Sequence, residues 1–153
     1  MEIVLYEPDI PQNAGTIMRM AACMSVPVHI IEPAGFPVSD RSFRRAGLDY
    51  LDAVKIERHV SFAAFEAWRR ENGRRLVLLT TRAKTAYPAF AFREGDLLMV
   101  GRESACVPDT VHAAADVSLR IPMREGLRSL NIAVALSMVL GEALRQTGRL
   151  NDA

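Results

Sequence analysis

Arg-Ser-Leu-Asn-Ile-Ala-Val-Ala-Leu-Ser-Met-Val-Leu occupies residues 128–140 and joins a polar opening to an apolar run. Apolar residues from 132 to 140 would lie on every side of a helix, which predicts a helix over about Leu130–Gln146 that is buried all round. Ser129 is its predicted N-cap and would direct free backbone N–H groups toward the space in front. A buried helix with a polar first turn indicates a binding site. Simple capping by Ser129 and a backbone contact of Asn131 would explain the same residues equally well.

Outward from this helix, short apolar runs bounded by turn residues alternate with amphipathic stretches. The predicted strands are Ile3–Tyr6, Val28–Ile31, Leu76–Thr80, Leu97–Val100 and Val117–Ile121, with Val54–Arg58 as a weaker sixth. The predicted helices are Asn13–Met24, Ser61–Glu71 and Pro108–Ala114, besides the C-terminal one. This alternation predicts one α/β domain over residues 1–153, with a mainly parallel sheet and helices on both faces. In such sheets ligands bind outside the carboxyl ends of the strands.

The composition excludes several classes of protein. The chain has 153 residues, 50% hydrophobic and 24% charged, with a net charge of +1. These values are ordinary for a soluble globular protein and imply no strong general affinity for nucleic acid. The longest uncharged apolar stretch, residues 129–141, is too short to span a bilayer, and the N-terminus lacks the basic start of a signal peptide. We expect a cytoplasmic protein without membrane contact.

The sequence spacing of cysteine and histidine indicates no metal site. Cys23 and Cys106 form no CxxC pair, and His29, His59 and His112 are scattered along the chain. Both cysteines are expected to be buried apolar fillers.

The loop after the first predicted strand, residues 7–15, leads into a helix with an unusual polar face. Two prolines stiffen this loop, and Asn13 is a possible helix cap. Gly15, Thr16 and Arg19 share a face that is not the apolar face of the helix. Gly15 permits close approach of another backbone or a ligand, and Arg19 would project over the open surface. A guanidinium there suits a phosphate or a developing oxyanion, although a lone exposed arginine needs no function.

Two further loops follow predicted strand ends. Gly101 permits close backbone approach to a ligand after one strand, and Glu103 could orient a partner arginine. Ile121 and Met123 could form the wall for a flat heterocycle after another. The sequence contains neither a P-loop nor a GxGxxG turn after the first strand, which argues against ordinary nucleotide-phosphate, nicotinamide or flavin binding.

Together these loops resemble the three motifs of the SPOUT class of RNA methyltransferases, and most nearly the short tRNA (cytidine/uridine-34 2′-O)-methyltransferases. The matching pieces lie in the order of the family and cover nearly the whole chain. They are residues 4–19 (VLYEPDIPQNAGTIMR), 29–33 (HIIEP), 44–50 (RRAGLDY), 79–81 (LTT), Gly101 with Glu103, 121–123 (IPM) and 129–131 (SLN).

The resemblance implies a fold that composition and periodicity do not predict. Proteins of this class thread the C-terminal helix through a loop to form a deep trefoil knot, and they work as homodimers. S-adenosylmethionine is implied as the methyl donor and S-adenosylhomocysteine as the product, with no metal. By position, the cofactor-binding residues are Leu79, Gly101, Glu103, Ile121, Met123, Ser129 and Leu130. The implied catalytic residues are Arg19, Asn13, Ser129 and Asn131.

The implied substrate is the ribose 2′-OH of the wobble nucleotide in a tRNA anticodon stem-loop, a setting in which unstacked nucleotides are accessible. The family assigns the key catalytic role to the arginine matching Arg19. Because a guanidinium stays protonated, we expect it to hold the adjacent phosphate and stabilise the developing alkoxide rather than act as a base. A dimer would gather the arginines expected to bind RNA on one surface. These are Arg41, Arg44, Arg45, Arg124 and Arg128.

Three positions depart from the family pattern. Glycine is usual where Cys106 stands, and a basic residue where Ala105 stands. Cysteine disfavours positive φ, so this turn and the cofactor affinity are expected to differ. A second asparagine is usual at Val134 in the tRNA enzymes, whereas other members of the class have valine there.

Other functions remain open from the sequence. The chain could methylate another tRNA or ribosomal RNA position. It could also be a catalytically silent knotted RNA-binding protein, although Asn13, Arg19, Glu103, Ser129 and Asn131 are all present. A small-molecule methyltransferase is disfavoured because the arginine clusters would lack a polyanionic partner.

Overall fold

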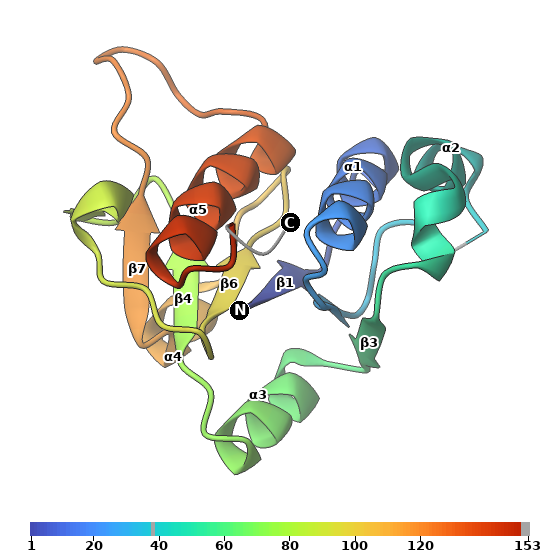
Figure 1. Ribbon diagram of the computed structural model, residues 1–153, viewed down its shortest axis with the longest axis horizontal. Coiled ribbons are helices and arrows are strands. Elements are labelled where there is room, and N and C mark those ends of the chain that lie inside the picture. The colour runs from blue at the N-terminus through green and yellow to red at the C-terminus, as the bar shows by residue number, and fades with distance from the viewer. Residues whose placement is uncertain (38, 151–153) are drawn as a thin grey trace.

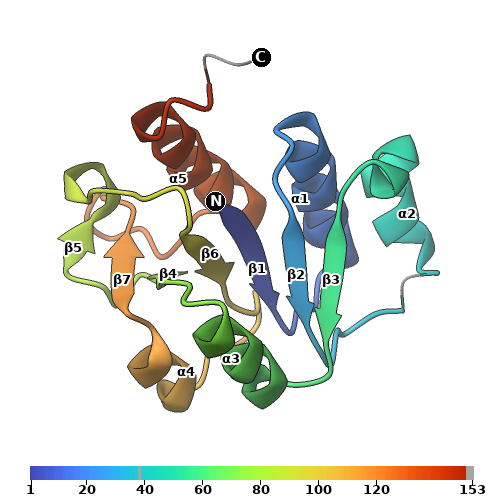
Figure 2. The same cartoon turned by 60° about the horizontal axis from the view of Figure 1, so that its bottom comes forward.

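The computed structural model describes residues 1–37 and 39–150 and contains a seven-stranded sheet. The strand order is β3-β2-β1-β6-β4-β7-β5 (Figure 2). Each neighbouring pair runs parallel. The strands are β1 (Glu2–Tyr6), β2 (Val28–Ile31), β3 (Ile56–His59), β4 (Leu76–Leu79), β5 (Thr85–Ala86), β6 (Leu97–Val100) and β7 (Val117–Arg120). The predicted parallel α/β sheet is therefore confirmed.

Helices cover both faces of the sheet, as predicted (Figures 1 and 2). One face carries α1 (Pro11–Cys23), α2 (Arg41–Gly47) and α5 (Ile132–Gln146), and the other carries α3 (Phe62–Glu71) and α4 (Asp109–Ala114). The 3₁₀ turns η1 (Leu48–Asp52) and η2 (Tyr87–Ala89) complete the elements. Among the described residues, no helix combines the length and apolar composition needed to cross a membrane.

The sequence predicted the central strands more accurately than the edges. β2 and β6 have the predicted bounds, and the buried patterns of β1, β2, β4 and β6 fit strands covered on both faces. The weaker prediction over Val54–Arg58 is wrong by two residues at its start, because β3 begins at Ile56. The sequence analysis missed α2 and β5, which are too short to show a clear periodicity.

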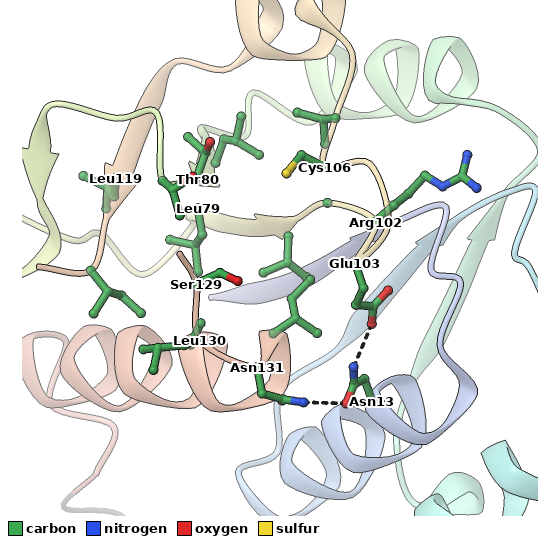
Figure 3. A pocket seen from close by; sticks show the side chains of 18 of the residues that line it. Asn13, Leu79, Thr80, Arg102, Glu103, Cys106, Leu119, Ser129, Leu130 and Asn131 are labelled. Atoms are coloured by element: carbon green, nitrogen blue, oxygen red, sulfur yellow. Dashed lines mark hydrogen bonds between the residues drawn. The ribbon is translucent and has the colours of Figure 1, made fainter. Parts of the chain in front are cut away.

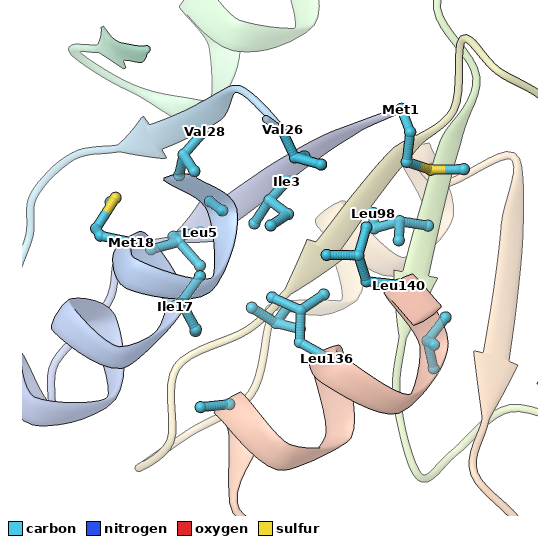
Figure 4. Packing of buried hydrophobic residues seen from close by; sticks show 14 of the residues in the cluster. Met1, Ile3, Leu5, Ile17, Met18, Val26, Val28, Leu98, Leu136 and Leu140 are labelled. Carbon is cyan, nitrogen blue, oxygen red and sulfur yellow. The ribbon is translucent and has the colours of Figure 1, made fainter. Parts of the chain in front are cut away.

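Alternate residues of the central strands enter two apolar clusters. Ile3 and Leu5 of β1 join the cluster beneath α1 and α5, whereas Val4 joins Phe65 beneath α3 (Figure 4). This separation follows from the two-residue period of a strand. On the second face Ser61 caps α3 by accepting a hydrogen bond from the Ala64 N–H at 3.1 Å.

Two expectations about α5 are wrong. The helix is buried on one side only: Leu136 and Leu140 pack on the sheet, whereas Val134 and Met138 are 51% and 42% exposed. The sheet covers one side of the helix, and no described segment of this chain covers the other. The N-cap is Asn131 rather than Ser129, because the helix begins two residues later than Leu130.

The first helix also differs from its prediction. α1 begins at Pro11, and its N-cap residue Ile10 makes no side-chain cap, so Asn13 lies inside the helix and does not cap it. Gly15 is buried against α2, where an added Cβ would lie 2.5 Å from the Ala46 Cβ and 2.6 Å from the Phe43 carbonyl oxygen. Gly15 therefore permits a second backbone, not a ligand, to approach.

Both cysteines are exposed, which corrects the expectation of buried fillers. Cys23 ends α1 at the surface, and Cys106 lies in the loop after β6. A hydrophobic side chain does not by itself specify burial when its segment is a loop or a helix end.

Candidate functional site

A cavity of about 410 Å³ opens at the carboxyl ends of β4, β6 and β7 (Figure 3). This is the edge at which parallel sheets bind ligands, and the volume lies within the range of small-molecule sites. Its walls come from the loops after these three strands, the N-terminal loop of α1 and the first turn of α5.

The cavity brings together most of the predicted site residues. All the predicted cofactor-binding residues line it, namely Leu79, Gly101, Glu103, Ile121, Met123, Ser129 and Leu130. Asn13 and Asn131, predicted to be catalytic with Ser129, line it as well. Sequence reasoning missed the roles of Ile10 and Ala135, which enter the wall through the packing of α1 and α5 rather than through any local motif.

A chain of side-chain hydrogen bonds joins three segments that are distant in sequence. The Asn131 Oδ1 accepts from the backbone N–H groups of Ala133 (2.9 Å) and Val134 (3.3 Å) at the start of α5. Its Nδ2 donates to the Asn13 Oδ1 at 2.9 Å, and the Asn13 Nδ2 donates to the Glu103 Oε1 at 3.2 Å (Figure 3). The N-terminus of α5 offers only N–H donors, so the Asn131 side chain must turn its oxygen toward the helix and its nitrogen toward Asn13. Asn13 must in turn present its oxygen to Asn131 and its nitrogen to Glu103.

Two carboxyl groups meet at the end of this chain. The Glu103 N–H donates to the Asp9 Oδ1 at 3.1 Å, and Ser104 Oγ donates to the other Asp9 oxygen. A hydrogen bond from the Glu103 side chain lowers the pKa of Asp9 to about 2, whereas burial first, and Asp9 second, raise the pKa of Glu103. The pair therefore takes up its first proton on Glu103 as the pH falls.

The loop after β6 folds back tightly on itself. Arg102 and Cys106 exchange two backbone hydrogen bonds of 3.0 and 2.8 Å, and Cys106 has φ +55°. A Cβ at Gly101 would lie 2.7 Å from the Cys106 carbonyl carbon, so the close approach permitted by Gly101 is that of its own loop. Cys106 thus adopts the left-handed conformation that glycine takes without strain. The expected change in cofactor affinity stays a prediction.

The predicted arginines lie at three places outside the cavity lining. Arg19 lies exposed on α1, with its Cζ 5.0 Å from the centroid of the Tyr50 ring. Arg41, Arg44 and Arg45 are exposed on α2, whereas Arg124 and Arg128 are exposed on the loop between β7 and α5. Of these residues, only Arg124 and Arg128 lie on a loop that also lines the cavity.

The histidines are less scattered than their spacing indicated. Adjacent parallel strands bring His29 and His59 together, with His29 Nδ1 2.9 Å from His59 Nε2 and Glu57 close by. His29 Nε2 lies 2.6 Å from a Glu2 oxygen. The centroids of the His29 and His59 rings are 5.2 Å apart. This distance fits two rings that meet edge to edge through these two nitrogens. Both nitrogens of His29 thus have hydrogen-bond partners in a polar network. His29, Glu57 and His59 also stand close enough together to hold a metal ion, which their spacing in the sequence did not indicate.

Comparison with known proteins identifies the family of this chain. The profile of the SpoU rRNA Methylase family matches residues 1–141. The chain belongs to the SpoU rRNA methylase family. This SpoU protein is 64% identical over 148 residues to a relative from Beijerinckia indica named tRNA (cytidine(34)-2′-O)-methyltransferase, covering 97% of this chain and 92% of the relative. A relative of the same name from Escherichia coli K12 is 43% identical over 150 residues, covering 97% and 94%.

Solved structures extend the comparison. One described as "Structural insights into the 2-OH methylation of C/U34 on tRNA" superimposes with a TM-score of 0.90 at 43% identity, covering 95% of this chain and 94% of that one. The SpoU methyltransferase AviRb from Streptomyces viridochromogenes in complex with AdoMet gives 0.87 at 27% identity, covering 95% and 60%. The family expected from the sequence motifs is confirmed.

Proposed function

We propose that this SpoU-family protein methylates the ribose 2′-OH of the wobble nucleotide, cytidine or a modified uridine at position 34, in tRNA anticodon loops. The observation that carries the proposal is the cavity at the carboxyl ends of β4, β6 and β7, which is lined by every residue predicted to bind the cofactor. The relatives from Beijerinckia indica and Escherichia coli bear the name of this activity. The cytoplasm, where tRNA is modified, is the proposed location.

The residues of the cavity fit S-adenosylmethionine. Apolar side chains of Leu79, Ile121 and Leu130 provide walls for a flat heterocycle. Within described residues 122–130, the one backbone–backbone hydrogen bond runs from the Leu127 N–H to the Arg124 carbonyl. Other main-chain groups of this loop are therefore free to form hydrogen bonds with the edge of the heterocycle. Arg102, also in the lining, has a buried Nε without a hydrogen-bond partner among the described residues. When bound, the cofactor supplies a methyl group on a sulfonium and leaves as S-adenosylhomocysteine.

The polar residues would orient the acceptor hydroxyl. Asn13, Ser129 and Asn131 stand at one side of the cavity, and the cap at α5 fixes the direction of the amides. Positioning of this kind supplies a large part of the acceleration in a transfer between two bound groups. The acceptor hydroxyl would give up its proton to solvent or a polar neighbour as its oxygen takes the methyl group from the sulfonium.

We further infer that the protein acts as a homodimer. Val134 and Met138 form an exposed apolar strip on α5 beside Met20 of α1, whose Sδ lies 3.0 Å from Ser137 Oγ. Pairing of this strip with a second copy would bury it and bring the Arg19 of one subunit toward the cavity of the other. Light scattering at assay concentration tests this, and a fully active monomer would contradict it.

In such a dimer Arg19 is the proposed catalytic arginine. Its planar guanidinium would hold the phosphate next to the acceptor ribose and stabilise the developing alkoxide. Arg19→Lys keeps the charge but loses the planar fork, so we expect most of the activity to disappear. Near-normal turnover of this variant would exclude the role.

The trefoil knot implied by the resemblance is also proposed. The segment from β7 to α5 crosses the carboxyl ends of the strands before α5 packs beside α1. Stretching of single molecules by their ends tests it, because a tightened knot would leave the unfolded chain shorter than its contour length. Full extension would exclude the knot.

The function is tested by incubating the purified protein with radiolabelled S-adenosylmethionine and total tRNA from a strain lacking the gene, followed by nucleoside mass spectrometry. Label in 2′-O-methylcytidine or a 2′-O-methyluridine derivative at position 34 is expected. Label at another tRNA position, or only in ribosomal RNA added in parallel, would retain the class of enzyme and exclude the wobble assignment. Cofactor binding without any transfer would indicate a silent RNA-binding protein.

A further inference from the structure

Arg19 is held by an aromatic ring rather than by an acid. Its Cζ lies 5.0 Å from the centroid of the Tyr50 ring, within the range of cation–π attraction. Tyr50 belongs to η1 and is partly buried, whereas Arg19 is exposed on the outer face of α1. No motif in the sequence joins these two residues, which are brought together by the packing of α1 against the segment formed by α2 and η1.

The position of Tyr50 is set independently of Arg19. α1 and α2 approach each other closely at Gly15, where an added Cβ would lie 2.5 Å from the Ala46 Cβ. η1 follows α2 directly, and Gly47 at their junction lies so near Leu51 that an added Cβ would be 2.6 Å from a Leu51 methyl. The ring therefore lies on a backbone fixed by packing, and the flexible arginine side chain adapts to it.

The partner of Arg19 is informative because the segment that carries Tyr50 also carries two acids. Asp49 and Asp52 stand on either side of Tyr50 in η1, yet Arg19 makes no salt bridge and no side-chain hydrogen bond within residues 1–37 and 39–150. Arg69, by contrast, is bound by the carboxylates of Glu66 and Asp116. A carboxylate would neutralise the guanidinium and occupy its N–H groups, whereas a ring face does neither.

We propose that Tyr50 is a positioning residue for Arg19. Its ring holds the guanidinium plane in place while leaving the charge and all five N–H donors available to a phosphate or a developing alkoxide. The inference rests on the proposed function insofar as Arg19 acts on RNA. The placement of Arg19 over the ring is a separate statement and has its own measurement.

The kinetic test compares Tyr50→Leu with Tyr50→Phe as the matched control. Tyr50→Leu removes the ring, and kcat for methyl transfer should fall about two- to five-fold, which corresponds to the ~0.5–1 kcal/mol of an exposed cation–π contact. The Kd for S-adenosylmethionine should stay unchanged, and the Tm should fall by only about 1–4 °C, as loss of the same contact predicts. Tyr50→Phe keeps the ring face and should retain wild-type kcat. Wild-type kcat in Tyr50→Leu, or an equal loss in Tyr50→Phe, would overturn the inference.

A second series avoids the risk that Tyr50→Leu does not fold. Incorporation of phenylalanines with one, two or more ring fluorines at position 50 weakens the negative face of the ring without changing its shape. The value of kcat should fall in step with fluorination. A flat response would overturn the proposal, because a purely steric role of the ring would be insensitive to fluorine.

The placement is measured without catalysis by NMR of the Arg19 Nε–Hε group. Protons above a ring resonate upfield, so this signal should move downfield in Tyr50→Leu and not in Tyr50→Phe. Absence of the shift excludes the contact even if the enzyme is active. Absence of methyl transfer by the wild-type protein, with the shift present, would refute the proposed function and leave the contact intact.

Discussion

Replacement of Cys106 by glycine should stabilise the protein. Cys106 has φ +55°, a conformation that costs a residue with a Cβ about 1–2 kcal/mol. Glycine removes this strain but loses about 0.5–1 kcal/mol more backbone entropy on folding. The thiol is exposed, so its removal sacrifices little buried surface. The difference predicts a gain of about 0.5–1 kcal/mol, which for a chain of this size raises Tm by about 1–4 °C.

Urea unfolding and calorimetry measure this gain, with two variants as controls. Cys106→Ala removes the thiol and keeps the Cβ, so its stability should match that of the wild type. Ser25→Gly, at φ +52° and far from the cavity, should show a similar gain. If Cys106→Gly is no more stable than Cys106→Ala while Ser25→Gly gains, the turn at Cys106 is not strained and the reasoning is refuted.

Three further predictions concern the scaffold of the site. Gly15→Ala should destabilise the fold by about 1–3 kcal/mol, because its Cβ would lie 2.5 Å from the Ala46 Cβ. Thermal unfolding measures this loss, and wild-type stability would contradict the close approach of α1 and α2. Asn131→Ala should lower the free energy of unfolding in urea by about 1 kcal/mol, because the cap of α5 is lost. Asn131→Asp still accepts hydrogen bonds from the helix and should retain most of the stability of the cap. Equal losses in the two variants would show that the hydrogen bond to Asn13 matters more than the cap. Stability should also fall in two stages on acidification, which unfolding at successive pH values measures. In the first stage, burial lowers the pKa of His59 below 6.5, so as the pH falls past 6.5 the unfolded chain takes up this proton before the folded chain does. In the second stage, the hydrogen bond with His29 lowers the pKa of Glu2 from 4.5 to about 2, so the stability present above pH 4.5 is lost toward pH 2. Asp9, whose pKa is also lowered to about 2, contributes to the same stage, so Glu2→Gln should reduce the second stage without abolishing it. An unchanged profile in Glu2→Gln would contradict the assignment.

The sequence alone determined the elements that depend on local patterns. The apolar runs of β2 and β6 are bounded by turn residues, so their limits could be read directly. The loops after β1, β6 and β7 could be assigned to a site because parallel strands place their carboxyl ends at one edge. The motif residues of these loops supplied the family.

Only the tertiary structure decided which residues meet and which surfaces stay open. Glu103, Asn13 and Asn131 form one chain of hydrogen bonds because β6 lies beside β1 and α5 returns to α1, and the strand order is a long-range property that local spacing does not specify. The exposed strip on α5 follows for the same reason, since periodicity reports how apolar a helix is but not how many of its sides have a neighbour. The ring beneath Arg19 belongs to this second group: sequence separation conceals the contact between Arg19 and Tyr50, and close packing of two helices creates it.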